Sequence, residues 1–135
     1  MDDPKAPPEK QTVLVVDDFA DGREMYAEFL EFQGFNVQTA KDGQEAVTMA
    51  REGHPDLILM DLSLPYLDGL AATRLLKGDA ATRDIPVVAL TGHVLGGQKS
   101  DAEEAGCEGF ISKPALPADV EQRIRALLSR KPLKP

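Results

Sequence analysis

Three short runs of apolar residues constrain the fold of this chain more than any other feature. The runs occupy residues 13–16, 57–60 and 87–90. Within each run the residues of both parities are apolar, so a strand formed there would present hydrophobic side chains to both faces of its sheet. A strand buried on both faces is typical of a parallel sheet that is covered by helices. The sequence therefore predicts a central parallel sheet.

Amphipathic segments alternate with these runs. In the segment 19–33 apolar residues recur at helical spacing, and Gly34 follows at the point where a helix end favours a left-handed backbone. This spacing predicts one helix with a single buried stripe. The residues assigned to that stripe are Met25, Tyr26, Phe29, Leu30 and Phe32.

The remaining elements repeat the alternation. Strands are predicted at 35–40 and 110–112, and helices after Asp42-Gly43, over 67–77, weakly over 96–105, and near the C-terminus, where Val120, Ile124, Leu127 and Leu128 form an apolar stripe. Five strands then alternate with five helices. This pattern predicts an α/β fold with a five-stranded parallel sheet, doubly wound, and helices on both faces.

Length and composition restrict the class of protein. A chain of 135 residues allows one domain, which we assign to 12–130, between a flexible N-terminal leader (1–11) and a C-terminal tail (131–135). The net charge of −8 argues against binding to nucleic acid or an anionic membrane. The lone Cys107 cannot form an internal disulfide, and the chain has neither a secretory signal nor an apolar membrane span. We therefore expect a cytoplasmic protein.

Polar residues stand at the end of four of the five predicted strands. They are Asp17 and Asp18, Asp61, Thr91 and Lys113. Ligands of a doubly wound sheet bind outside the carboxyl ends of its strands, so these residues are expected to converge. Three acids in one place repel one another unless a cation balances them.

The residue types indicate which cation and which chemistry. Carboxylate oxygens suit Mg²⁺, whereas Zn²⁺ is disfavoured because Cys107 is alone and His54 and His93 lack ligand spacing. A hydroxyl (Thr91) and an ammonium (Lys113) facing a carboxylate are suited to phosphoryl transfer. A nucleophilic carboxylate would then form an acyl phosphate.

Four motifs in this order resemble the receiver domain of two-component response regulators. They are Asp17-Asp18, the stretch 61–65 with Asp68-Gly69 after it, Thr91-Gly92, and the segment 110–114. The resemblance covers about Thr12 to Arg130 and implies the flavodoxin-like receiver fold. Within the family, the segments 85–91 and 106–114 look most like small stand-alone receivers, such as those of chemotaxis and cell-cycle phosphorelays, and like receivers of hybrid kinases.

The resemblance implies a role for each strand-end residue. Asp61 would accept the phosphoryl group, and Thr91 and Lys113 would contact the phosphoryl oxygens. Phe110 would be the aromatic switch residue, whose ring turns inward as Thr91 moves toward the phosphate. The Lys113-Pro114 peptide bond would be cis, which is largely confined to bonds that precede proline.

The resemblance also implies the metal ligands. Asp18 and Asp61 would bind Mg²⁺ directly, Asp17 mainly through water, and the backbone carbonyl of Ser63 would complete the protein's share. Two residues depart from the common pattern, Ser63 and His93. These positions tune the lifetime of the phosphoryl group in the family, so we expect a lifetime that differs from those of better-known relatives.

The function implied is that of a switch. The phosphoryl group would come from a phosphohistidine of a histidine kinase or histidine phosphotransfer protein. Phosphorylation would alter the surface formed by the helix at 96–105, the strand at 110–112 and the C-terminal helix, through which a downstream protein target binds. We expect a monomer or weak dimer that phosphorylates and dephosphorylates itself, without turnover of a separate substrate and therefore not an enzyme in the usual sense.

Three alternatives stay open. The chain could be a receiver fragment of a hybrid histidine kinase that passes the phosphoryl group onward, although the initial Met and the tails favour a complete small protein. It could be a haloacid-dehalogenase-type phosphatase, although the adjacent acids after the first strand and the absence of a cap domain argue against this. It could also be a phosphorylation-independent interaction module, although every acidic and lysine position is present.

Overall fold

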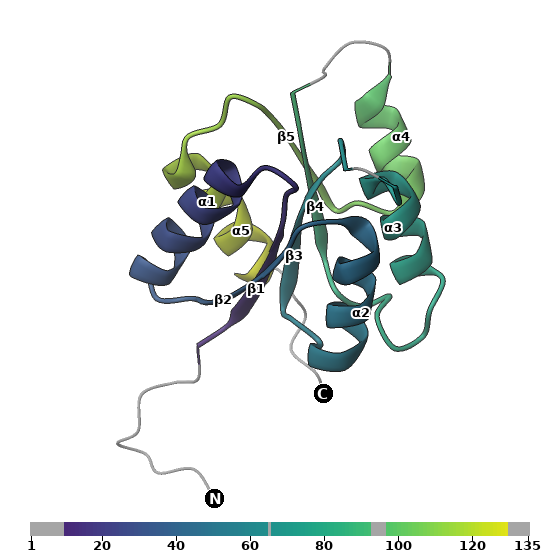
Figure 1. The fold of residues 1–135 in the computed structure, drawn as a ribbon, viewed down its shortest axis with the longest axis horizontal. Helices are drawn as coiled ribbons and strands as arrows, with labels where there is room; N and C mark the ends of the chain where they lie inside the picture. Colours follow the sequence, from purple (N-terminus) through teal and green to yellow (C-terminus); the bar gives the residue numbers. More distant parts are fainter. Residues whose placement is uncertain (1–9, 65, 93–96, 130–135) are drawn as a thin grey trace, which may run out of the picture.

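The structure, a computed structural model, describes residues 10–64, 66–92 and 97–129 and has alternating strands and helices throughout (Figure 1). In chain order the elements are β1 (Thr12–Val16), α1 (Ala20–Phe32), β2 (Asn36–Ala40), α2 (Gly43–Gly53), β3 (Leu57–Asp61), α3 (Gly69–Lys77), β4 (Val87–Thr91), α4 (Gln98–Ala105), β5 (Gly109–Ser112) and α5 (Pro117–Ser129). The predicted alternation of five strands and five helices is confirmed. The predicted tail and the first nine residues of the predicted leader lie outside the described residues.

All strand pairs of the sheet are parallel, and the strand order is β2-β1-β3-β4-β5. The chain runs outward from β1 to β2 and then returns past β1 to β3, so the order reverses between β1 and β3. Helices α1 and α5 cover one face of the sheet, and α2, α3 and α4 cover the other (Figure 1). The doubly wound fold is therefore confirmed, and its ligand-binding position lies at the ends of β1 and β3.

The apolar runs fill both layers, as their composition predicted. Val13, Val15, Leu57 and Leu59 belong to the core that packs against α1 and α5. The residues of opposite parity, Leu14, Val16, Ile58 and Met60, belong to the core that packs against α2 and α3. The sheet is thus buried between two hydrophobic layers.

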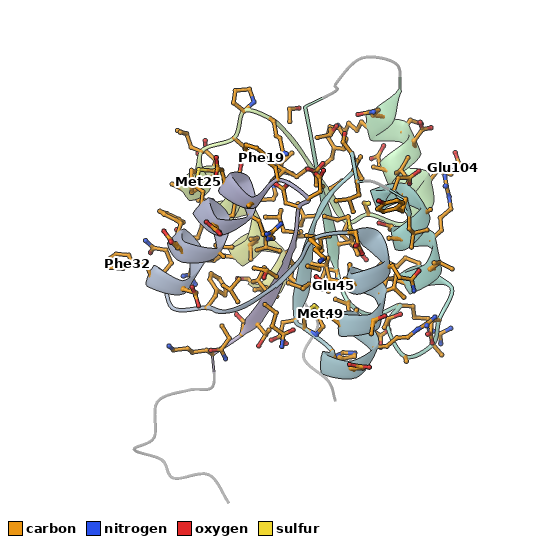
Figure 2. The ribbon with its side chains drawn as sticks, in the orientation of Figure 1. Phe19, Met25, Phe32, Glu45, Met49 and Glu104 are labelled. Atoms are coloured by element: carbon orange, nitrogen blue, oxygen red, sulfur yellow. The ribbon has the colours of Figure 1, made fainter. Side chains whose placement is uncertain are left out.

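The predicted stripe of α1 is partly wrong. Phe32 is 86% exposed and Met25 is 44% exposed, and both lie on the outer side of α1 (Figure 2). The buried residues are instead Tyr26, Ala27 and Leu30, with Phe29 half-buried. Successive helical residues are rotated by about 100°, so Leu30 and Phe32 point in nearly opposite directions and cannot both face the sheet.

Several boundaries also differ from the prediction. Phe35 is buried but precedes β2. Helix α3 begins at Gly69 and not at residue 67, because the side chain of Asp68 caps it by accepting a hydrogen bond from the Ala71 N–H at 2.8 Å. Helix α4 begins at Gln98 in the described part of the chain, whereas its predicted start at 96 lies outside the described residues, and Cys107 after the helix is half-buried. Among the described residues, no helix has the length and apolar character needed to span a membrane.

Candidate functional site

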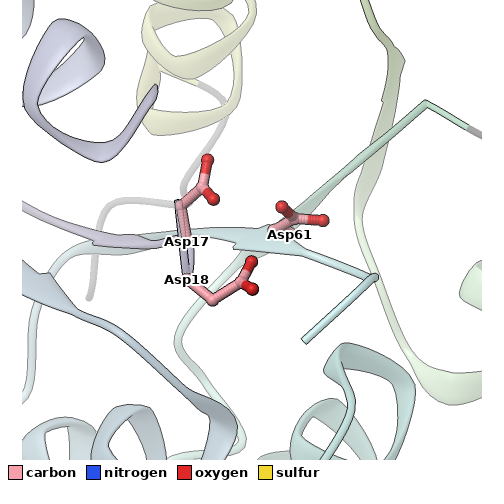
Figure 3. A group of neighbouring side chains, drawn as sticks. All are labelled: Asp17, Asp18 and Asp61. Carbon is pink, nitrogen blue, oxygen red and sulfur yellow. The ribbon is translucent and has the colours of Figure 1, made fainter. Parts of the chain in front are cut away.

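Three carboxylates meet at the ends of β1 and β3 (Figure 3). Asp17 and Asp18 follow β1 directly, Asp61 is the last residue of β3, and the two strands pair in register up to Val16 and Met60. One carboxylate oxygen from each acid lies within 4.8 Å of the other two. The convergence expected from the strand ends is therefore present in the structure.

Asp17 is the most buried acid of this cluster, with 3% of its surface exposed. Its Oδ1 accepts a hydrogen bond from the Phe19 N–H at 2.9 Å, and its own N–H donates to the Ala40 carbonyl. Burial raises the pKa of Asp17 above its usual value, and the nearby charge of Asp61 acts in the same direction. The Phe19 N–H and the charge of Lys113 oppose this shift without cancelling it. The folded structure therefore disfavours the ionised form of Asp17.

Asp61 is also buried, and both of its carboxylate oxygens are engaged. Oδ1 accepts a hydrogen bond from the Ser63 N–H at 2.9 Å, and Oδ2 accepts one from Lys113 Nζ at 3.1 Å. The Ser63 N–H therefore orients Asp61 from two residues ahead. Ser63 itself is exposed, and the role expected for its carbonyl stays a prediction.

Lys113 faces two of the three acids. Its Nζ lies 3.1 Å from Asp61 Oδ2 and 3.8 Å from Asp17 Oδ2. Partial burial alone would lower the pKa of Lys113, but its hydrogen bond to Asp61 and the charges of Asp61 and Asp17 together raise it. The ammonium is therefore charged at neutral pH. With all groups ionised, one ammonium faces three carboxylates, so negative charge remains in excess.

This donor set fits a hard divalent cation. Oxygens from three carboxylates lie close enough together to share one ion, and oxygen ligands are those that Mg²⁺ prefers. Asp18 is exposed, so the cluster is open to solvent from its side, and Mg²⁺ usually keeps several waters when it binds to proteins. The excess of negative charge is what such an ion would offset.

Thr91 ends β4 and is fully buried. Its carbonyl oxygen accepts a hydrogen bond from the Lys113 N–H at 2.7 Å, which ties the end of β4 to the residue after β5. Its hydroxyl donates to Oε1 of Gln98, the first residue of α4, at 2.8 Å. The structure therefore brings Thr91 and Lys113 together as expected, and it adds a partner for the Thr91 hydroxyl.

Phe110 lies on β5 and is half-buried. Its neighbours belong to a small apolar cluster of Leu62, Ala89 and Ala102, between the sheet and α4. The side chain is thus part of the packing beneath α4, and its role as a switch stays a prediction. The Lys113-Pro114 peptide bond is cis, as expected.

Three features of the site were not predicted. Gln98 was missed because it lies in a weakly helical segment. The N–H of Phe19 was missed as a partner of Asp17, although an Asp that accepts from the N–H two residues later is a common turn signal and could have been recognised. Gly69 was missed as a packing residue: a Cβ there would lie 2.4 Å from the Asp61 carbonyl oxygen, so only glycine lets α3 approach the end of β3 this closely.

An apolar groove adjoins the acid cluster, between α1 and the segment that follows β5. It reaches from Asp17 and Lys113 to exposed hydrophobic side chains, of which Phe19 is 64% exposed and Leu116 is 68% exposed. Tyr26 also lines the groove, and its phenol donates a hydrogen bond to the Ala115 carbonyl at 3.0 Å. His93, noted above as a departure from the common family pattern, lies outside the described residues.

Comparison with known proteins agrees with this geometry. Residues 13–125 match the family pattern of the response regulator receiver domain. The polar-differentiation response regulator DivK of Brucella ovis is 38% identical over 112 residues, which cover 82% of this chain and 91% of DivK. The chain therefore spans nearly the whole length of that relative.

Solved structures of similar fold include two bacterial signalling proteins, one of which was solved with a metal ion. The receiver domain of the sensor histidine kinase PA1611 from Pseudomonas aeruginosa, solved with a magnesium ion coordinated in its active site cleft, is 30% identical with a TM-score of 0.83, and the match covers 90% of this chain and 99% of that one. The chemotaxis response regulator CheY4 of Vibrio cholerae is 26% identical with a TM-score of 0.83, and the match covers 88% of this chain and 99% of that one.

Proposed function

The chain belongs to the response regulator receiver family, and from this membership and the geometry of the acid cluster we propose that Asp61 accepts a phosphoryl group from a phosphohistidine of a partner protein. The observation that carries the proposal is the position of the Asp61 carboxylate. It lies among two further acids and within hydrogen-bond distance of a lysine, at the edge of the sheet where ligands bind.

The proposed transfer uses groups that are already in place. An oxygen of Asp61 forms a bond to phosphorus, the bond from phosphorus to the donor's imidazole nitrogen breaks, and its electron pair stays on that nitrogen. The product is an acyl phosphate on Asp61. Lys113, which is charged at neutral pH, would contact one phosphoryl oxygen, and the Thr91 hydroxyl would donate a hydrogen bond to another.

Asp17, Asp18 and Asp61 would hold Mg²⁺, with the carbonyl of Ser63 as a further ligand. When bound, the ion supplies positive charge that offsets the carboxylates and the transferring phosphoryl group. Asp17 and Asp18 would not react themselves. This proposed role in holding the ion accounts for the presence of three acids, whose charges repel one another, at this edge of the sheet.

The phosphoryl donor would be a histidine kinase or a histidine phosphotransfer protein. The apolar groove supports this part of the proposal, because it leads from exposed Phe19 and Leu116 directly to Lys113 and Asp17. An apolar helix of the donor that occupied the groove would carry its histidine to the phosphoacceptor. The expected downstream partner, bound by α4, β5 and α5, remains a proposal, as do a cytoplasmic location and a monomeric or weakly dimeric state.

We further propose that the chain is a switch and not an enzyme with a separate substrate. A phosphatase of the haloacid-dehalogenase type would turn over a generic aryl phosphate at ordinary enzymatic rates, and we expect no such turnover. Transfer onward to another protein, as in a hybrid kinase relay, would use the same Asp61 chemistry in the reverse direction. Profiling of phosphotransfer against histidine kinases and phosphotransfer proteins of the same genome would identify the partner.

The direct test is labelling with acetyl phosphate in the presence of Mg²⁺. The wild-type chain should gain one phosphoryl group by intact-mass measurement, and Asp61→Asn should gain none, because the amide cannot attack phosphorus. Asp84→Asn, a substitution at an exposed acid before β4, is the matched control and should be labelled as the wild type is. Undiminished labelling of Asp61→Asn would overturn the proposal.

A further inference from the structure

Among the described residues, helix α4 has few features that would hold it in place. It has eight residues, of which Ala102 and Ala105 are buried. Gly97 before it and Gly106 after it are both in the left-handed region, with φ of 81° and 111°, and the N-cap residue Gly97 has no side chain that could cap the helix. Its last turn carries no basic residue that would interact favourably with the helix dipole. A helix of this kind shifts or unfolds locally at low cost.

One of the interactions that hold α4 begins inside the proposed phosphorylation site. The hydroxyl of Thr91 donates to Gln98 Oε1 at 2.8 Å, so the buried end of β4 is joined to the first residue of α4. Gln98 is half-buried, and an amide that points toward a buried hydroxyl is fixed in one orientation. A glutamine that served only to cover the surface would keep its rotational freedom in water.

The proposed function gives the same hydroxyl a second acceptor. A threonine hydroxyl has one proton, so it donates to one acceptor at a time. Donation to a phosphoryl oxygen on Asp61 and donation to Gln98 Oε1 therefore compete. Because each interaction excludes the other, phosphorylation weakens the tie to α4, and the tie weakens phosphorylation by the same free energy.

We propose that Gln98 is a positioning residue that restrains phosphorylation of Asp61 by holding the Thr91 hydroxyl, and that loss of this hydrogen bond on phosphorylation releases the first turn of α4. This inference rests on the proposed function, since it needs a phosphoryl group on Asp61. It assigns the coupling between the site and α4 to one side-chain pair.

The test compares two substitutions that move the rate in opposite directions. Gln98→Leu removes the acceptor and should raise the initial rate of labelling by acetyl phosphate. The expected increase is about 2- to 10-fold, which corresponds to the net free energy of one hydrogen bond. Gln98→Glu keeps an acceptor and gives it a charge, so labelling should be slower than in the wild type. Ser100→Ala, at an exposed position of the same helix, is the matched control and should label at the wild-type rate.

A second background separates positioning from a general effect on structure. In a Thr91→Val chain the hydroxyl is absent, so Gln98→Leu should no longer change the labelling rate. In the otherwise wild-type chain, Gln98→Leu should also shift the amide NMR signals of the first turn of α4 toward their positions in the phosphorylated protein. Unfolding in urea would verify that all variants are folded.

The outcomes distinguish this inference from the proposed function. If the wild type is labelled on Asp61 but Gln98→Leu has the wild-type rate, or has the same gain with Thr91→Val, the proposed function stands and the inference is wrong. If the wild-type chain takes up no phosphoryl group at Asp61, the proposed function fails and the inference fails with it.

Discussion

A lysine meets carboxylates at both edges of the sheet, but the two edges are built in opposite ways. At the amino edge, where the strands begin, Lys77 Nζ donates to Glu108 Oε2 at 2.8 Å and to the carbonyl oxygens of Ile85 at 2.8 Å and Arg83 at 3.1 Å. The other oxygen of Glu108 accepts from the Val87 N–H at 2.8 Å. An ammonium has three protons, so all donors of Lys77 are used, and one carboxylate balances its charge.

At the carboxyl edge, where the strands end, Lys113 lies near Asp17 and Asp61, and Asp18 completes a cluster of three acids. Its one ammonium does not balance their charge. The comparison shows that lysine and acidic residues stabilise the fold where their hydrogen bonds and charges are matched. Where they are left unmatched, the arrangement suits the binding of a ligand at the expense of stability.

The pKa values of two acids, one at each edge of the sheet, are shifted in opposite directions. At the carboxyl edge, burial raises the pKa of Asp17, so ionisation of this group opposes folding above its folded pKa. At the amino edge, the N–H of Ala81 and the side chain of Arg51 lower the pKa of Asp79, so its ionisation favours folding. The contrast between the edges can therefore be tested by stability measurements.

The largest effect is expected from removal of the amino-edge lysine. Lys77→Met leaves the carbonyl of Ile85, the carbonyl of Arg83 and the carboxylate of Glu108 without this donor, and should lower the free energy of unfolding by about 2 kcal/mol. Unfolding in urea at neutral pH measures this change. Lys99→Met, at an exposed lysine of α4, is the control and should be nearly neutral. A loss as small as that of the control would mean that the amino edge is not a source of stability.

A smaller effect of opposite sign is expected from an acid at the carboxyl edge. Asp18→Asn removes one charge from the cluster and should raise the free energy of unfolding by about 0.5 to 1 kcal/mol in a chelator. Glu108→Gln, the matched substitution at the amino edge, should lower it, because Lys77 loses its counter-charge. Urea unfolding with and without Mg²⁺ tests both variants.

Mg²⁺ should reverse the order of stability of the wild type and Asp18→Asn. If the cluster binds Mg²⁺ as proposed, the ion should stabilise the folded wild type, and Asp18→Asn should gain less because it lacks one of the proposed ligands. Glu108→Gln should gain as much as the wild type does. If Asp18→Asn is less stable than the wild type in chelator, the three acids do not strain the carboxyl edge.

The sequence allowed prediction of the fold and of most of the carboxyl edge. The runs at 13–16 and 57–60 end abruptly in Asp17-Asp18 and Asp61, and the parallel pairing of two adjacent strands then brings these acids together. Their meeting follows from the topology, so no knowledge of loop structure was needed. The same holds for Thr91 and Lys113, each of which also follows or ends a strand.

The features that could not be predicted depend on packing. Helical spacing identifies residues that share a stripe, but apolar residues lie on more than one side of α1, so the choice between Leu30 and Phe32 required the sheet to be in place. Gln98 is separated from Thr91 by a segment that contains Gly96-Gly97, and no periodic signal fixes where α4 lies. The hydrogen bond between Thr91 and Gln98 could therefore be seen only in three dimensions.

The smallest effect is the pH dependence of the exposed pair at the amino edge. Asp79 Oδ2 lies 2.9 Å from Arg51 Nε, and its Oδ1 accepts from the Ala81 N–H at 2.9 Å. Because the folded pKa of Asp79 lies below the usual value of 3.8, its ionised form stabilises the folded chain at neutral pH, and this contribution is lost as the pH falls through the folded pKa. Asp79→Asn should therefore unfold at a slightly lower urea concentration than the wild type at neutral pH, and the two midpoints should converge in acid. Asp84→Asn, which lacks such partners in the part of the chain that the structure describes, is the control and should have the wild-type midpoint at neutral pH. If the difference in urea midpoint between Asp79→Asn and the wild type persists unchanged in acid, the charge of Asp79 does not stabilise the folded chain.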